Sequence, residues 1–257
     1  MKKKLYQRSI ELTNGPVTSS LIRSFAQSSA SRWVIPNYIK TYKIATADIE
    51  NHVNSFPTLH DFFIRKLKAE SRPTAGLPVV SPVDGKIEIL GDMHEGIRFL
   101  VKNQQYSLAD LLGNNGLADA YQNGKYIVLY LSPADYHRIH SPASGNILKQ
   151  YVLGKKSYPV NGPGLMYGKS PISGNYRMIT ELETAFGSML VVKVGAMFIN
   201  SIKLTNNQNS WEKGEEVAYF SFGSTVVLFF EENRIDFCGN AKSGEQIKVG
   251  EALAHMV

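Results

Sequence analysis

The most informative stretch of this chain is residues 219–230, Tyr219-Phe220-Ser221-Phe222-Gly223-Ser224-Thr225-Val226-Val227-Leu228-Phe229-Phe230. It predicts two apolar strands with a Gly-Ser-Thr set between them. Comparable apolar runs occur at residues 79–81, 86–90, 125–131 and 190–194. The 257 residues also include 21 glycines, 11 prolines and 11% aromatic residues. This composition favours many short strands joined by turns over a helical bundle.

The order of elements predicts an α+β protein. We expect a β-rich, sandwich or barrel-like core in residues 77–257, preceded by a helical, membrane-facing layer in residues 1–76. The predicted helices begin at Thr18 or Ser19, at the apolar stretch 33–42, and at Thr58, and a short one spans 107–112. A loop rich in glycine and proline is expected over roughly 154–175.

The positive charge of the chain is concentrated at its N-terminus. Residues 1–43 hold eight of the 28 Lys and Arg against one acid, a net charge of +7, whereas the remainder is at −1. Aromatic residues such as Trp33 are interleaved with these cations, a pattern suited to an anionic membrane surface. The alternative is a helical pair packed on the core, and nucleic acid is a weaker third interpretation because no binding motif accompanies the charge. No stretch is apolar enough to span a bilayer.

Three polar clusters lie at the ends of predicted strands. The segment 81–85 carries Asp84, the segment 135–142 carries His137 and His140, and the Gly-Ser-Thr set carries Ser224. Each has an ordinary interpretation, as turn residues or structural histidines. A metal site is disfavoured because no third ligand has a supporting spacing and Cys238 is the single cysteine.

Together, Asp84, His140 and Ser224 provide a carboxylate, a base and a nucleophile. A hydrolase nucleophile elbow is disfavoured, because a β-branched Thr and a second strand follow Ser224 instead of a helix.

In this order the motifs resemble those of the phosphatidylserine decarboxylases, a family of self-cleaving pyruvoyl enzymes, over essentially the whole chain. The motifs that carry the resemblance are Leu59-His60-Asp61-Phe62-Phe63-Ile64-Arg65, Ser-Pro-Val-Asp-Gly at 81–85, Tyr-His-Arg-Ile-His-Ser-Pro at 136–142, Ser157-Tyr158-Pro159-Val160-Asn161, Val194-Gly195-Ala196 and Gly-Ser-Thr at 223–225. Phe222 departs from the Leu that is commoner before Gly-Ser-Thr, and Asn200 from the Gly of many relatives. Both changes concern details of the pocket.

The resemblance implies that Asp84, His140 and Ser224 form a self-cleavage triad that cuts the chain between Gly223 and Ser224. Ser224 would become the pyruvoyl cofactor, with no metal. This group would form a Schiff base with phosphatidylserine and release CO2 and phosphatidylethanolamine, with His137 supplying the proton. The resemblance also nominates substrate contacts at Tyr158, Asn161, Gly195 and Ala196.

The same resemblance implies a lyase made as a zymogen. Its chains 1–223 and 224–257 would remain together as a heterodimer, peripheral to the cytoplasmic side of the cell membrane, with higher oligomers left open and no nucleic-acid partner. Two alternatives remain at this stage. One is a pyruvoyl decarboxylase of a soluble amino acid, and the other is a non-enzymatic lipoyl-like or hybrid-sandwich binding module, suggested by the turn-and-strand patterns at 214–218 and 244–254.

Overall fold

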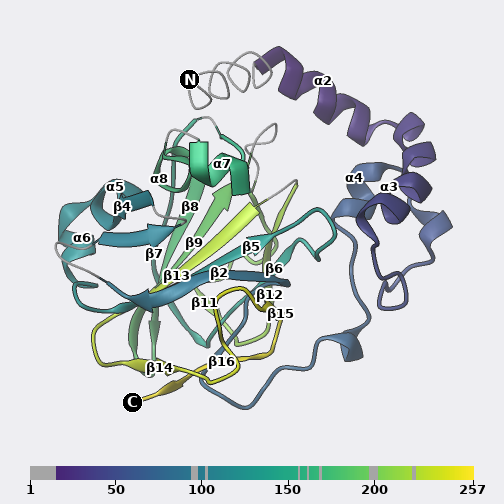
Figure 1. Ribbon diagram of the computed structural model, residues 1–257. Coiled ribbons are helices and arrows are strands. Elements are labelled where there is room, and N and C mark those ends of the chain that lie inside the picture. Colours follow the sequence, from purple (N-terminus) through teal and green to yellow (C-terminus); the bar gives the residue numbers. More distant parts are fainter. Residues whose placement is uncertain are drawn as a thin grey trace.

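The computed structural model describes residues 16–93, 98–101, 104–155, 157–160, 162–167, 170–196, 202–221 and 224–257. Three groups of elements make up this part of the chain: an eight-stranded antiparallel sheet, smaller sheets and helices that cover its two faces, and a helical layer at the N-terminal end (Figure 1).

The eight-stranded sheet forms the centre of the protein. Its strands, in spatial order, are β11 (Ser210–Trp211), β7 (Gly145–Leu153), β8 (Arg177–Thr184), β9 (Gly187–Gly195), β13 (Ser224–Phe230), β5 (Lys125–Leu131), β2 (Gly85–Asp92) and β15 (Gln246–Ile247). The order begins at β11 and ends at β15, so the described strands form an open sheet and not the closed barrel that the sequence left open. The sandwich half of the prediction fits this architecture.

Two three-stranded sheets pack on one face of the large sheet. One contains β10 (Ile202–Leu204), β12 (Glu216–Phe220) and β6 (Arg138–His140), and the other contains β1 (Val79–Val80), β16 (Ala252–Met256) and β14 (Ile235–Phe237). The main core lies between the layers and takes Val226, Leu228 and Phe230 from β13. Val227 and Phe229 point to the opposite face, which is also buried. Burial on both faces explains why β13 is a continuous apolar run.

The second face of the large sheet is covered by short elements. These are the hairpin β3 (Arg98–Val101) and β4 (Gln104–Ser107) and the helices α5 (Leu108–Leu112), α6 (Asn115–Asp119), α7 (Gly162–Tyr167) and α8 (Pro171–Gly174). The helix expected at 107–112 is present, with the Ser107 hydroxyl as its N-cap acceptor. The stretch 154–175 is less irregular than expected, because α7 and α8 lie within it and bury Leu165 and Ile172.

The N-terminal helical layer has a small core of its own. It contains α2 (Pro16–Gln27), η1 (Ser29–Val34), α3 (Ile35–Tyr42), η2 (Val53–Ser55), α4 (Leu59–Phe63) and η3 (Ala69–Ser71). Ile35, Phe56 and Phe62 are among its buried residues. Thr58 caps α4 as predicted. The helix ends at Phe63, and the backbone N–H of the next residue, Ile64, donates to the carbonyl oxygens of His60 and Phe62. Figure 1 shows α2, α3 and α4 gathered on one side of the sheets.

Candidate active site

Four central strands bring the predicted functional residues to one end of the large sheet. Ser224 begins β13 and is paired with Leu131, at the end of β5, and with Gly195, at the end of β9. Asp84 directly precedes β2, which is paired with β5. At Gly85 a Cβ would lie 2.6 Å from the carbonyl oxygen of Tyr130. Glycine therefore allows the start of β2, and with it Asp84, to lie close against β5.

His140 reaches the same end of the sheet from the layer above it. It is the last residue of β6 and is paired with Glu216 of β12. Its backbone N–H donates to the carbonyl oxygen of Pro82 at 2.8 Å, two residues before Asp84. Asp84 and His140 therefore lie close together, at the end of the sheet where Ser224 begins β13. That the three residues act together stays a prediction.

The ring of His140 is held through both nitrogens. Nδ1 lies 2.7 Å from the carbonyl oxygen of Gly214 and therefore carries the proton, whereas Nε2 accepts from the Tyr136 hydroxyl at 3.1 Å. Burial lowers the pKa of His140 below its ordinary value, an effect partly opposed by the Gly214 carbonyl and by the charges of Glu216 and Asp84. At neutral pH the ring is neutral, with the lone pair of a base on Nε2.

The carboxylate of Asp84 has different partners from those the triad implies. Arg72 donates to it through Nε, at 2.9 and 3.1 Å from the two oxygens, and through Nη2 at 2.5 Å. The backbone N–H of Val249 donates to it at 2.9 Å, and Arg72 also binds Asp48 at 3.1 Å. Since both ring nitrogens of His140 are engaged elsewhere, Asp84 acts on His140 through its charge and not through a direct hydrogen bond in this state.

Ser224 is fully buried, and within the described part of the chain its Oγ has no hydrogen-bond partner. A buried hydroxyl left unpaired costs free energy, and Ser224 shares this feature with the neighbouring Thr225. Its position fits the residue that would become a pyruvoyl group. Gly223 and Phe222, on the other side of the predicted cut, lie outside the described residues.

His137 is also fully buried. Its Nδ1 lies 2.9 Å from the carbonyl oxygen of Asp135, and its ring packs against Phe63 with the centroids 3.9 Å apart and the planes tilted by 33°. Nε2 has no partner among the residues that the structure describes. Burial, helped by the positive charge of Arg65, lowers the pKa of His137 to about 3. The ring is therefore neutral before any substrate binds.

The nominated substrate contacts are partly brought together. The side-chain amide of Asn175 donates to the carbonyl oxygens of Tyr158 and Gly195, each at 2.8 Å. Its Oδ1 accepts from the backbone N–H of Tyr158, also at 2.8 Å. Tyr158 and Gly195 are thus linked next to Ser224, and Ala196 is buried beside them. The fourth nominated residue, Asn161, lies outside the described residues, as does Asn200.

Three residues of this site carried no role in the sequence analysis: Arg72, Tyr136 and Asn175. Tyr136 lies inside the histidine motif, and this position could have indicated that it belongs to the site. Arg72 and Asn175 stand alone in the sequence, and nothing in the spacing singles them out. In the ranges that the structure describes, no group of three His, Cys, Asp or Glu residues could hold a metal ion. No described helix is both long and apolar enough to cross a membrane.

Known proteins resemble this chain over nearly its whole length. The family model for phosphatidylserine decarboxylase matches residues 59–255. A phosphatidylserine decarboxylase proenzyme of Bacillus thuringiensis subsp. konkukian is 47% identical over 256 residues, which cover 99% of this chain and 98% of the relative. A proenzyme of the same description from Bacillus cereus is 48% identical with the same coverage. The chain therefore belongs to the phosphatidylserine decarboxylase family, whose members are carboxy-lyases made as proenzymes.

Proposed function

We propose that this chain cuts itself between Gly223 and Ser224 and then, as a decarboxylase of phosphatidylserine, uses the new pyruvoyl group for catalysis. The observation that carries the proposal is the fully buried, unpartnered Oγ of Ser224 at the sheet end where neutral His140 and Asp84 also lie. Membership of the family supports the activity and disfavours both the soluble amino-acid decarboxylase and the non-enzymatic module.

In the self-cleavage step, His140 is the base. Its Nε2 takes the Ser224 proton once the Tyr136 hydroxyl releases it, while the Gly214 carbonyl keeps the proton on Nδ1 and Asp84 stabilises the imidazolium through its charge. The Ser224 oxygen attacks the carbonyl carbon of Gly223, and the amide becomes an ester. Elimination from the ester leaves Gly223 with a free carboxylate and starts a second chain with a dehydroalanine at residue 224. This residue tautomerises to an imine, which water hydrolyses to the pyruvoyl ketone with loss of ammonia.

After cleavage, Asp84 has a second role. Arg72 and Asp84 belong to the chain 1–223, and Val249 belongs to the chain 224–257. The hydrogen bond from the Val249 N–H to the Asp84 carboxylate therefore helps to hold the two products together. The pairing of β13 with β5 and β9 on both sides contributes far more contact to the heterodimer.

When present, the pyruvoyl group supplies a carbonyl that condenses with the substrate amine and accepts the electrons released as CO2 leaves. His137 holds the proton that replaces CO2. Burial disfavours the protonated form of the His137 ring, so the ring takes up this proton only beside a negative charge. The anionic substrate brings that charge. Tyr158, Asn161, Gly195 and Ala196 are proposed as the wall against which the headgroup lies.

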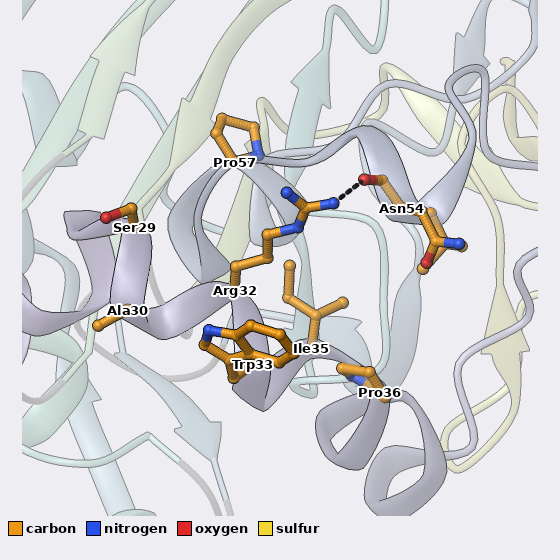
Figure 2. A pocket seen from close by; sticks show the side chains of 9 residues that line it. Ser29, Ala30, Arg32, Trp33, Ile35, Pro36, Asn54 and Pro57 are labelled. Atoms are coloured by element: carbon orange, nitrogen blue, oxygen red, sulfur yellow. Dashed lines mark hydrogen bonds between the residues drawn. The ribbon is translucent and has the colours of Figure 1, made fainter.

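The helical layer is the proposed membrane contact. Trp33 is 87% exposed, and Leu21 and Phe25 are also exposed on α2. Trp33 and Arg32 border a groove of about 660 Å³ in which Arg32 donates to the carbonyl oxygen of Asn54 (Figure 2). Exposed aromatic and aliphatic side chains beside cations suit the interface of an anionic membrane. The proposed location of the enzyme is therefore peripheral, on the cytoplasmic side of the cell membrane.

Intact mass under denaturing conditions tests the self-cleavage. Mature protein should contain chains of 223 and 34 residues, and the short chain should carry a reactive ketone at its N-terminus. The Ser224→Ala variant is the control and should remain uncut. An active enzyme with an intact chain would contradict the pyruvoyl proposal.

A comparison of substrates by CO2 release tests the substrate specificity. Purified enzyme should release CO2 from phosphatidylserine vesicles and not from free amino acids. Release from a free amino acid alone would favour the soluble decarboxylase.

Vesicle sedimentation tests the membrane contact. Replacing five basic residues by Gln should weaken binding to phosphatidylserine vesicles, measured at low salt, and should leave self-cleavage intact. The replaced residues are Lys2, Lys3, Lys4, Arg8 and Arg23, of which the first four lie outside the described residues. Unchanged binding would make the helical layer a packing element only.

A further inference from the structure

The loop that precedes His137 is held by the N-terminal helical layer through three consecutive carbonyl groups. The Tyr38 hydroxyl donates to the carbonyl oxygen of Pro133 at 3.0 Å. Nη2 of Arg65 donates to the carbonyl oxygens of Ala134 at 2.9 Å and Asp135 at 3.1 Å. The side chain of Ala134 packs on the small core of the helical layer.

The carbonyl of Asp135 links this arrangement to His137. It accepts from Nη2 of Arg65 and, at 2.9 Å, from Nδ1 of His137. The acceptor fixes the proton on Nδ1 and leaves Nε2 as the free nitrogen. Phe63, two residues before Arg65, packs against the same ring. One short segment of the helical layer thus holds the carbonyl that fixes the tautomer of the histidine and packs against its ring.

Arg65 is unusual as a buried cation. It is 4% exposed, and the structure gives it no carboxylate partner within the described ranges. Nη1 lies 3.5 Å from the carbonyl oxygen of Phe62, whose ring is 5.2 Å from the guanidinium, and Nε has no described hydrogen-bond partner. Burying a guanidinium in this way is costly. Its shorter hydrogen bonds all go to the main chain of the histidine loop, which points to a positioning role.

We propose that Arg65, supported by Tyr38, is a positioning residue for His137 in decarboxylation, so that the N-terminal helical layer forms part of the active site. This inference rests on the proposed function, because it takes His137 as the residue that protonates the product. Membrane contact and catalysis would then depend on the same layer.

The protein contains a matched control for a purely structural role. Arg138 also joins α4 to β6, because its Nε donates to the carbonyl oxygen of Ile64 at 2.8 Å and its Nη1 pairs with Glu216 at 2.6 Å. These bonds leave the Asp135 carbonyl to Arg65 and His137. Replacing Arg138 loosens the same interface without removing the bond that orients His137.

The test compares Arg65→Gln, Arg65→Lys, Tyr38→Phe and Arg138→Gln. All four should self-cleave, because none of these side chains contacts Ser224 within the described residues and the ring of His140 is held by other groups. Decarboxylation of phosphatidylserine in mixed micelles should show kcat lowered by on the order of 100-fold in Arg65→Gln, with KM little changed. Arg65→Lys should recover part of the loss, and Tyr38→Phe should show a smaller one.

The pH profile of kcat separates positioning from stability. In Arg65→Gln the apparent pKa that belongs to His137 should move to higher pH, because the cation that disfavours protonation of the ring is gone. Arg138→Gln should leave that pKa in place. Wild-type kcat and pH profile in Arg65→Gln, or equal losses in Arg138→Gln, would overturn the proposal. If Arg65→Gln does not fold, unchanged kcat in both Arg65→Lys and Tyr38→Phe overturns it.

A parallel His137→Ala variant identifies which assignment is at fault. Loss of decarboxylation in His137→Ala with a wild-type Arg65→Gln refutes the positioning role alone. Full activity in His137→Ala refutes the role of His137 in the proposed function, and the positioning role with it.

Discussion

Replacing Lys193 by Met should stabilise this protein and remove part of its pH dependence. Lys193 lies on β9 and is fully buried. Its Nζ donates to the Thr180 hydroxyl at 2.8 Å and lies 5.0 Å from the centre of the Trp211 ring. No described carboxylate pairs with it. Desolvation therefore lowers the pKa of Lys193 from 10.5 to about 7.

The size of the effect follows from that difference in proton affinity. Three and a half powers of ten at about 1.4 kcal/mol each give roughly 5 kcal/mol of lost stability at pH values below the folded pKa. The lost hydrogen bond and cation–π contact offset about 1 kcal/mol each. Thr180 keeps a partner, because Gln150 also donates to its hydroxyl at 3.0 Å. Met fills a similar volume, so a net gain of about 2–4 kcal/mol is expected near neutral pH.

The sign of the pH dependence is fixed by the direction of the shift. Between the folded pKa of about 7 and the unfolded value of 10.5, the unfolded chain binds more protons at Lys193 than the folded chain. The parent protein therefore gains stability from this residue as the pH rises through that window. The advantage of Lys193→Met should shrink accordingly, from a few kcal/mol at about pH 7 to near zero at about pH 10.

Urea unfolding of the uncut Ser224→Ala protein is the assay, because a single chain keeps the transition independent of protein concentration. The free energy of unfolding is compared with and without Lys193→Met at several pH values. Lys149→Met is the control, since Lys149 is more than half exposed and lies 3.9 Å from Glu181. An advantage of Met that is equal at low and high pH, or a destabilised Lys193→Met, would refute the argument from desolvation.

The remaining predictions concern the self-cleavage site. Ser224→Ala should give one folded, inactive chain of 28.6 kDa by intact mass, because no oxygen is left to form the ester. His140→Ala should block self-cleavage, whereas His137→Ala should cleave at least partly and decarboxylate poorly. Complete cleavage in both variants would refute these assignments. The rate of self-cleavage, measured by quenching samples at timed intervals, should stay constant as the pH is lowered past 6.5. It should fall at lower pH, where His140 becomes protonated, because the pKa of this residue is lowered. Gly85→Ala should slow cutting, since its Cβ would meet the Tyr130 carbonyl and displace Asp84; a wild-type rate would show that the turn has room to adjust.

Local sequence was sufficient for much of the fold. The run 125–131 predicts a strand and forms β5 over those residues. The helix predicted at 107–112 forms as α5, with Ser107 as its N-cap. These elements depend on neighbours a few residues away, which a sequence shows directly. The sequence also supplied a candidate carboxylate, base and nucleophile in Asp84, His140 and Ser224, and the family resemblance assigned them to one site.

The tertiary structure decided which side chains touch within that site. The partner of Asp84 is Arg72, the ring of His140 is held by Gly214 and Tyr136, and Asn175 links Tyr158 to Gly195. None of these pairings has a local pattern.

The same holds for Lys193 and Arg65, which the sequence presents as ordinary cations and the fold buries. Their burial depends on elements far apart in the chain, since Trp211 covers one and the loop 133–135 binds the other. The alternation of side chains along a strand predicts which face of the sheet a residue occupies. Only the packing between layers decides whether water is excluded from that face. The sequence therefore determined the strands and the candidate reactive residues, and the assembled layers determined their charge states and contacts.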